Sequence, residues 1–308
     1  MAVGKTNPPV RGTQLLVEHM GAVFSRPSLV AIEIAWRWLF GIPFLLVCGQ
    51  QIRRILTVYP IADSSLGSLD TQNPWIAAQQ ITQAVAFYEP RVMAVLHWLL
   101  PVVALAWIVL SGFGRSVLLR QMESGRTQRV AFRPLTMMAL QAVWLALFAA
   151  TIWGWLRCIG WAAEGNLLAA AEPDLVAFAS WAIFLSLGFF TLFAVVSWTA
   201  SIAPVLASLE GRSALSAITQ SFQLGRAFTG KLVEINLVLG IVKLALVVVA
   251  MVFSAAPLPF SDELGPGAMH GIAAASVLFY IVANDYFQTV RLKAFVEFWR
   301  VYRSAPIA

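Results

Sequence analysis

Four charged side chains stand inside long apolar segments of this 308-residue chain. Glu33 and Arg37 lie four residues apart within Leu29–Gly49, so they would share one face of a helix. Asp285 lies at a similar predicted depth in a later apolar segment, and Lys243 lies in a wholly apolar run. Such charges form a pair that fixes helix register, relay protons or substrate, or reach towards the membrane interface. We expect Arg37 to contact Asp285 or Glu33, and these three interpretations stay open.

The sequence contains no arrangement typical of catalysis, and we expect no catalytic residue, no metal site and no cofactor. It has no P-loop and no HExxH, GxSxG or CxxC motif. His97 is typical of a helix–helix hydrogen bond, with a haem or chlorophyll ligand as the alternative. His19 and His270 fall outside the apolar segments on opposite sides, which argues against a haem held by two histidines. Cys48 and Cys158 are favoured as free thiols, and a disulfide between them is the alternative.

The elements that must hold these charges are six apolar segments, each about the length of a bilayer crossing of about 20 residues. The chain is 59% hydrophobic and 12% charged, and a soluble domain would have about twice that charged fraction. The sequence predicts an all-α polytopic membrane protein, with residues 1–308 forming a single integral membrane domain. The predicted spans are about 28–57, 90–120, 134–162, 173–207, 229–254 and 270–302.

Three shorter helices are predicted outside the spans. An amphipathic helix over 13–24 would lie on the inner leaflet, and one over 74–88 on the outer surface, ending before Pro90. A third, over 213–224, would lie along the inner surface before the fifth span. Its apolar face is formed by Leu215, Ile218 and Phe222.

Basic residues gather in alternate connecting segments, which predicts the orientation of the chain. The segment 115–133 has five arginines and one acidic residue, whereas 164–174 and 262–263 are acidic. Both termini are therefore expected in the cytoplasm of a bacterial inner membrane, with Arg53 and Arg54 as exceptions on the outer side. No cleavable signal peptide is recognised, so the first span would serve as its own insertion signal. The net charge of +6 fits contact with membrane lipids rather than nucleic acid.

The segment between the fourth and fifth spans carries a short motif. An acidic residue precedes a small-residue helix of the form A-L-x-x-S-(F/W)-x-L, and a glycine or basic residue then leads into a span. The matching positions are Glu210, Ala217, Ser221, Phe222, Leu224, Gly225 and Arg226. The motif resembles a signature in a loose group of bacterial six-span proteins, which includes the YciC-like proteins and the membrane domain attached to some glycerophosphodiester phosphodiesterases.

The resemblance covers residues 195–303, and it implies a six-helix membrane bundle. It implies no catalytic residue, because the phosphodiesterase activity of that group belongs to a separate soluble domain that has no counterpart here. From the residues alone, Gly225 is a suitable C-terminal stop for the helix over 213–224.

Three function classes follow from these observations. The first is a non-enzymatic scaffold or accessory subunit that packs against other membrane proteins, and it is the one predicted. The alternative is a permease-like component for a small or lipidic substrate, which would use the charges within the spans. An intramembrane enzyme is the third class, and no acid–base pair or metal-ligand set supports it. A scaffold would pack its intramembrane charges dry and paired, whereas a transporter would line a water-filled cavity with them.

Overall fold

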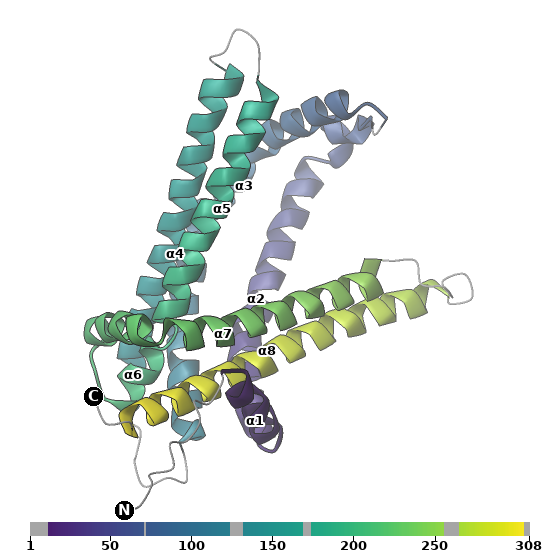
Figure 1. The fold of residues 1–308 in the computed structure, drawn as a ribbon. Coiled ribbons are helices and arrows are strands. Elements are labelled where there is room, and N and C mark those ends of the chain that lie inside the picture. The colour runs from purple at the N-terminus through teal and green to yellow at the C-terminus, as the bar shows by residue number, and fades with distance from the viewer. Residues whose placement is uncertain (1–11, 71, 124–131, 169–173, 256–264, 305–308) are drawn as a thin grey trace, which may run out of the picture. The chain divides into compact units, whose positions relative to one another are not determined.

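The computed structural model describes residues 12–70, 72–123, 132–168, 174–255 and 265–304. Every regular element in these ranges is a helix, as Figure 1 shows. Among them, six helical segments are long and apolar enough to cross a membrane, so the prediction of an all-α polytopic membrane protein with six spans is confirmed. These segments are Pro27–Val58, Gln79–Met122, Pro134–Asn166, Leu175–Leu209, Val233–Ser254 and Gly267–Arg300. The cytoplasmic location of the termini stays a prediction.

The chain divides into two compact units, each of which is described by itself. The small unit is Ala35–Ser111, and the large unit comprises the described residues of 1–34 and 112–308. The divisions fall inside two long helices, α2 (Pro27–Val58) and α3 (Pro74–Met122).

The large unit contains two pairs of helices that pack along each other. One pair is α4 with α5 and the other is α7 with α8 (Figure 1). Two short helices complete the unit, because α1 packs on α7 and α8, and α6 contacts α4, α7 and α8. The bounds are α1 Gly12–Phe24, α4 Pro134–Ala163, a π turn η3 Glu164–Leu168, α5 Leu175–Ala200, α6 Ala203–Leu209, α7 Ala214–Ala255 and α8 Pro266–Ser304.

The buried apolar core of the large unit gathers where helix ends meet, and we call this region the packed base. It is built from α1, the first turns of α2, the last turns of α3, the start of α4, α6, the first half of α7 and the end of α8. Its largest fully buried apolar side chains include Phe295, Leu118, Leu119, Met137, Ile202 and Leu206. Outside the base the spans expose mostly apolar side chains, as expected where lipid is the solvent.

The small unit contains the rest of α2 and α3 and the connection between them. Gln80 holds this connection, because its Nε2 donates to the carbonyl of Ser68 and its Oε1 accepts from the backbone N–H of Asp70, each at 2.8 Å. The Tyr88 hydroxyl donates to the carbonyl of Tyr59 at 3.1 Å. The connection therefore has its own hydrogen bonds, and it includes two 3-10 turns, η1 (Ile61–Asp63) and η2 (Ser65–Ser68).

Two of the predicted short helices are parts of longer ones. The helix predicted over 74–88 continues through Pro90 and Pro101 as the 49-residue α3. The helix predicted over 213–224 continues as the 42-residue α7, so the expected stop at Gly225 was wrong. A glycine inside a helix costs only about 1 kcal/mol relative to alanine, and apolar surroundings favour continued backbone hydrogen bonding. The third, over 13–24, is confirmed as a helix, and its place on the membrane surface stays a prediction.

The fourth predicted span is interrupted near its end. The predicted segment 173–207 divides into α5 and α6 at Ser201 and Ile202. Pro204 explains the break, because proline has no N–H to donate and its ring clashes with the carbonyl four residues earlier. The chain instead makes tighter turns, with Ser201 N–H donating to the Trp198 carbonyl at 3.2 Å and Val205 N–H to the Ile202 carbonyl at 3.0 Å.

Candidate functional site

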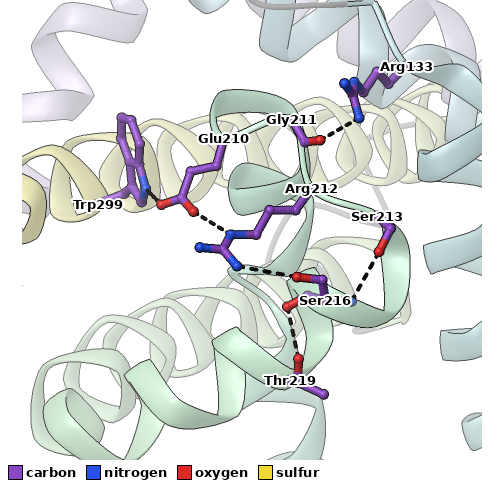
Figure 2. Close-up of polar contacts among 8 residues, drawn as sticks. All are labelled: Arg133, Glu210, Gly211, Arg212, Ser213, Ser216, Thr219 and Trp299. Atoms are coloured by element: carbon purple, nitrogen blue, oxygen red, sulfur yellow. Dashed lines mark hydrogen bonds and ion pairs between the residues drawn. The ribbon is translucent and has the colours of Figure 1, made fainter.

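Side chains from separate helices meet at the turn between α6 and α7, and we call this cluster the turn node (Figure 2). Gly211 has a φ of 67°, in the left-handed region that glycine adopts without strain. Its carbonyl accepts a hydrogen bond from Nη1 of Arg133, which precedes α4, at 2.5 Å. A Cβ atom at Gly211 would lie 3.2 Å from Nη2 of Arg133. Both the backbone conformation and the close arginine therefore favour glycine here.

Glu210 is the centre of the turn node (Figure 2). Its Oε1 accepts a hydrogen bond from the indole Nε1 of Trp299 on α8 at 2.8 Å. Its Oε2 accepts from Nε of Arg212 at 2.6 Å, and Nη1 of Arg212 donates to the Ser216 hydroxyl on α7 at 3.3 Å. One carboxylate therefore joins the end of α6 to α8 and, through Arg212, to the start of α7.

The electrostatics of the node keep Glu210 ionised. Its side chain is 16% exposed. Burial by itself raises the pKa of this carboxyl, but hydrogen bonds from Trp299 and Arg212 and the charge of Arg212 outweigh it, so the pKa is lowered. An ionised carboxylate whose oxygens both accept hydrogen bonds is an anchor rather than a proton donor. The node is therefore suited to holding helices together and unsuited to general acid catalysis.

A second ion pair ties the end of α8 to the end of α3. Arg300 pairs with Glu123 and with Glu297, and Glu123 is buried. The three-residue spacing of Glu297 and Arg300 in one helix could have been found from the sequence. The pairing with Glu123, 177 positions away, could not. Both this pair and the turn node lie against the packed base, where Trp299 is itself a core residue.

The predicted intramembrane charges occupy different units. Glu33 and Asp285 lie in the large unit and are 0% and 1% exposed, and each makes at least one polar or electrostatic contact. Arg37 lies in the small unit, with its guanidinium 5.3 Å from the centre of the Trp36 ring. Lys243, on α7, is half-buried and also has an interacting partner. The contact of Arg37 with Asp285 or Glu33 stays a prediction.

The motif residues at the start of α7 divide into an inner and an outer face. The predicted apolar stripe is divided, since Leu215 is 74% exposed and Phe222 is also exposed, whereas Ile218 is half-buried and packs against the core. The side that faces the interior of the unit consists of smaller side chains and one leucine, namely Ala217, Ser221 and Leu224. Small residues allow helices to approach closely, which gives the motif a packing explanation. The position of this segment along the inner membrane surface stays a prediction.

His19 on α1 is a buried titratable group that sequence reasoning did not assign to the site. Its Nε2 is buried and has no hydrogen-bond partner among the described residues. The helix is fastened beside it, because the Tyr286 hydroxyl donates to the Met20 carbonyl at 2.9 Å. Burial lowers the pKa of His19, and Lys293 lowers it further, while nearby carboxylates such as Glu297 raise it without cancelling the effect of burial. The neutral imidazole is therefore the form that fits the fold.

The remaining candidates add no catalytic group to the described part of the chain. Cys48 and Cys158 are free thiols there. Within the same residues, no three His, Cys, Asp or Glu side chains are arranged to hold a metal ion. No family model, curated protein or solved structure matches the chain. The resemblance of the 210–226 motif to bacterial six-span proteins stays a prediction, and the six apolar helices identify an integral membrane protein.

Proposed function

We propose that the protein is a non-enzymatic membrane scaffold or accessory subunit, which packs laterally against other membrane proteins. The observation that supports this proposal is the contrast between the packed base and the spans. In the most apolar 18 residues of each span, few side chains are buried. The buried share is 0% in the fourth and sixth spans, 6% in the second and fifth, and at most 17% in any span. Helices in a membrane associate through close packing, so spans with so little packing of their own have wide faces for a partner.

The outer face of α5 is the clearest such surface. Ile183, Leu187 and Phe190 follow one another at helical spacing and are all exposed. An adjacent side of α5 already has a partner, because the Ser186 hydroxyl accepts a hydrogen bond from Trp155 Nε1 of α4 at 2.9 Å. The α5 stripe, defined as these three apolar residues, is therefore the face that we assign to a neighbouring membrane protein.

The polar groups of the large unit agree with this role. Glu210 is ionised and engaged by two donors, and Arg300 is engaged by two carboxylates. Groups held in this way stabilise a fold and are poorly placed to exchange protons with a substrate. These polar groups therefore support a structural role for the protein.

Site-specific photo-crosslinking in native membranes tests the scaffold role. A photoreactive amino acid at Phe190 should give adducts with a discrete protein partner, and the same label at Ile183 and Leu187 should give the same adduct. Phe193 is the matched control, because its ring lies 6.0 Å from that of Trp144 and 5.6 Å from that of Phe148 on α4, so crosslinks there should stay within the chain. Crosslinks from all three stripe positions to lipid alone would remove the support for a lateral partner.

A permease-like function is the second candidate, and the burial of acidic groups favours it. Glu33 and Asp285 are buried in the large unit, where Asn236 and Thr289 are buried too. Acidic groups at membrane depth are often parts of proton or ion pathways.

Substitution of the predicted pair distinguishes the two candidates. Arg37→Ala should cost about 3–5 kcal/mol if it leaves a buried acid uncompensated, and adding Asp285→Ala should recover part of that loss. A double variant that regains both stability and cellular function indicates a structural pair. A double variant that regains stability but loses uptake of a substrate favours the permease. Strictly additive losses would disprove the pairing itself.

A further inference from the structure

Arg91 on α3, in the small unit, contacts two aromatic rings. The centre of its guanidinium lies 3.9 Å from the centre of the Tyr59 ring and 4.4 Å from that of Phe87. Its Nη1 also donates to the backbone carbonyl of Phe87. Tyr59 is fixed in turn by the hydroxyl of Tyr88, which donates to the Tyr59 carbonyl. The guanidinium is therefore oriented by two ring contacts and one hydrogen bond before any ligand arrives.

This positive charge has no acidic partner in the described part of the chain. No described carboxylate forms an ion pair with Arg91, and this includes the neighbouring Glu89, whose side chain is exposed. The Nε atom is buried without a hydrogen-bond acceptor. Nη2 is not among the buried atoms, and no described group accepts a hydrogen bond from it. A partly buried cation with an accessible donor is thus left to be neutralised from outside.

The surroundings of Arg91 indicate where that neutralising group lies. Val85 and Met93, on either side of it along α3, are large apolar residues that are exposed, as expected for side chains in contact with lipid. Arg53 and Arg54 are exposed in the last turns of α2 and add positive charge to the same unit. Arg91 lies inside α3, at the position where the sequence predicts that the second span begins, near residue 90. An arginine at the border of a span meets the phosphate layer of the bilayer, and a guanidinium matches phosphate oxygens well.

We propose that Arg91, fixed by Tyr59 and Phe87, is a binding site for a phosphate group, and that the phosphate belongs to an anionic phospholipid. The rings supply orientation and Nη2 supplies the accessible donor, and the charge of Arg91, which has no acidic partner among the described residues, favours a lipid with net negative charge over a zwitterionic one. The site is independent of the lateral partner proposed above, because it lies in the small unit and the α5 stripe lies in the large one.

The test is hydrogen–deuterium exchange of the full chain in nanodiscs of phosphatidylcholine, with and without phosphatidylglycerol. Peptides covering 59–93 report this site locally, so lipid contacts of the basic segment 115–133 do not obscure it. Phosphatidylglycerol should slow exchange in these peptides. Arg91→Gln should weaken the apparent affinity for phosphatidylglycerol, measured from the lipid fraction that gives half of the slowing, by at least about tenfold, as expected for loss of a charged hydrogen bond. Arg53→Gln is the matched control, because it removes an exposed arginine from the same unit, and it should have a much smaller effect.

Four results would overturn the proposal. Equal loss in Arg91→Gln and Arg53→Gln would indicate general charge rather than a built site. If phosphatidylglycerol has no effect on exchange in the wild type, an anionic lipid is not the ligand. If sodium phosphate in pure phosphatidylcholine slows exchange equally, the site binds free phosphate instead. If Arg91→Gln fails to fold, Arg91→Lys is used for the test instead, because it keeps the charge without the planar donor. Phosphatidylglycerol should slow exchange clearly less in Arg91→Lys than in the wild type, and equal slowing would disprove the guanidinium site.

Discussion

The hydrogen bond between Trp299 and Glu210 allows the turn node to be tested quantitatively. Trp299→Phe removes the Nε1 donor, which lies 2.8 Å from an ionised carboxylate, and a hydrogen bond to a charged group contributes about 1.5–3 kcal/mol. Glu210→Gln keeps the shape of the side chain but removes its charge. The pairing with Arg212 adds less than about 1 kcal/mol, because the Arg212 side chain is 40% exposed and water screens it. We expect each single substitution to lower the free energy of unfolding by about 2–3 kcal/mol.

A double-mutant cycle separates the hydrogen bond from the other effects of each change. The double variant should lose about 1 kcal/mol less than the sum of the two single losses, because a glutamine oxygen still accepts from Trp299 and only the charge-assisted part of the shared bond is counted twice in that sum. The measurement is unfolding by sodium dodecyl sulfate in mixed micelles, followed by far-ultraviolet circular dichroism, since substitution of a tryptophan alters fluorescence. Arg212→Gln is the control, with a loss under about 1 kcal/mol. Strictly additive losses would refute the view that this bond joins α6 to α8.

The same node predicts a pH dependence. The pKa of Glu210 is lowered in the folded protein, so its stabilising contribution is complete above the ordinary value of 4.5 and is lost as the pH falls through the lowered folded pKa. In Glu210→Gln this part of the dependence should be absent. An equal loss of stability in the variant and the wild type as the medium is acidified would assign the effect to other carboxylates.

Further predictions concern packing, histidine protonation and topology. Gly112→Ala should destabilise by about 1–3 kcal/mol, since its Cβ would lie 2.7 Å from the backbone nitrogen of Met138, whereas Gly188→Ala, with open space around it, should be neutral or slightly stabilising in the same unfolding assay. The pKa of His19 is lowered on folding, so stability should fall as the pH drops below 6.5 towards the folded pKa, and His19→Met should flatten that part of the curve in thermal melts. Single cysteines at positions 125 and 305 should be protected from impermeant reagents in intact cells while 165 and 264 react, and labelling of 125 would reverse the predicted orientation.

The six spans could be predicted from the sequence because the bilayer constrains them strongly. The length of each apolar segment, with proline and charged residues at its borders, indicated where each span lies, and α4, for example, begins at the predicted Pro134. The same local rules were wrong about where two helices end. Pro90 and Gly225 would end most helices in water, but in an apolar setting an interrupted helix leaves backbone groups without partners, so both helices continue.

The candidate site could be predicted only in part, because its bonds join residues that are distant in the sequence. Glu210 was singled out by its place in the motif, but its partner Trp299 lies 89 positions away and carries no local sign of that role. The apolar stripe at Leu215 was easy to recognise from its spacing, yet periodicity alone does not say whether an apolar face meets protein or lipid. In a membrane both surroundings are apolar, so periodicity did not reveal that Ala217, Ser221 and Leu224 face the interior while Leu215 and Phe222 are exposed.

The composition of the packed base has a consequence for biogenesis. The base combines residues from α1, near the start of the described chain, with Val290–Trp299 on its last helix. A membrane insertase releases spans in order as the ribosome proceeds, so the first five spans can enter the bilayer before Val290–Trp299, which belong to the sixth span and close the base, have been made. Insertion and folding are therefore separate stages in this protein. A chain truncated before Val290 should reach the membrane with most of its spans in place and still be recognised by quality-control proteases as unfinished.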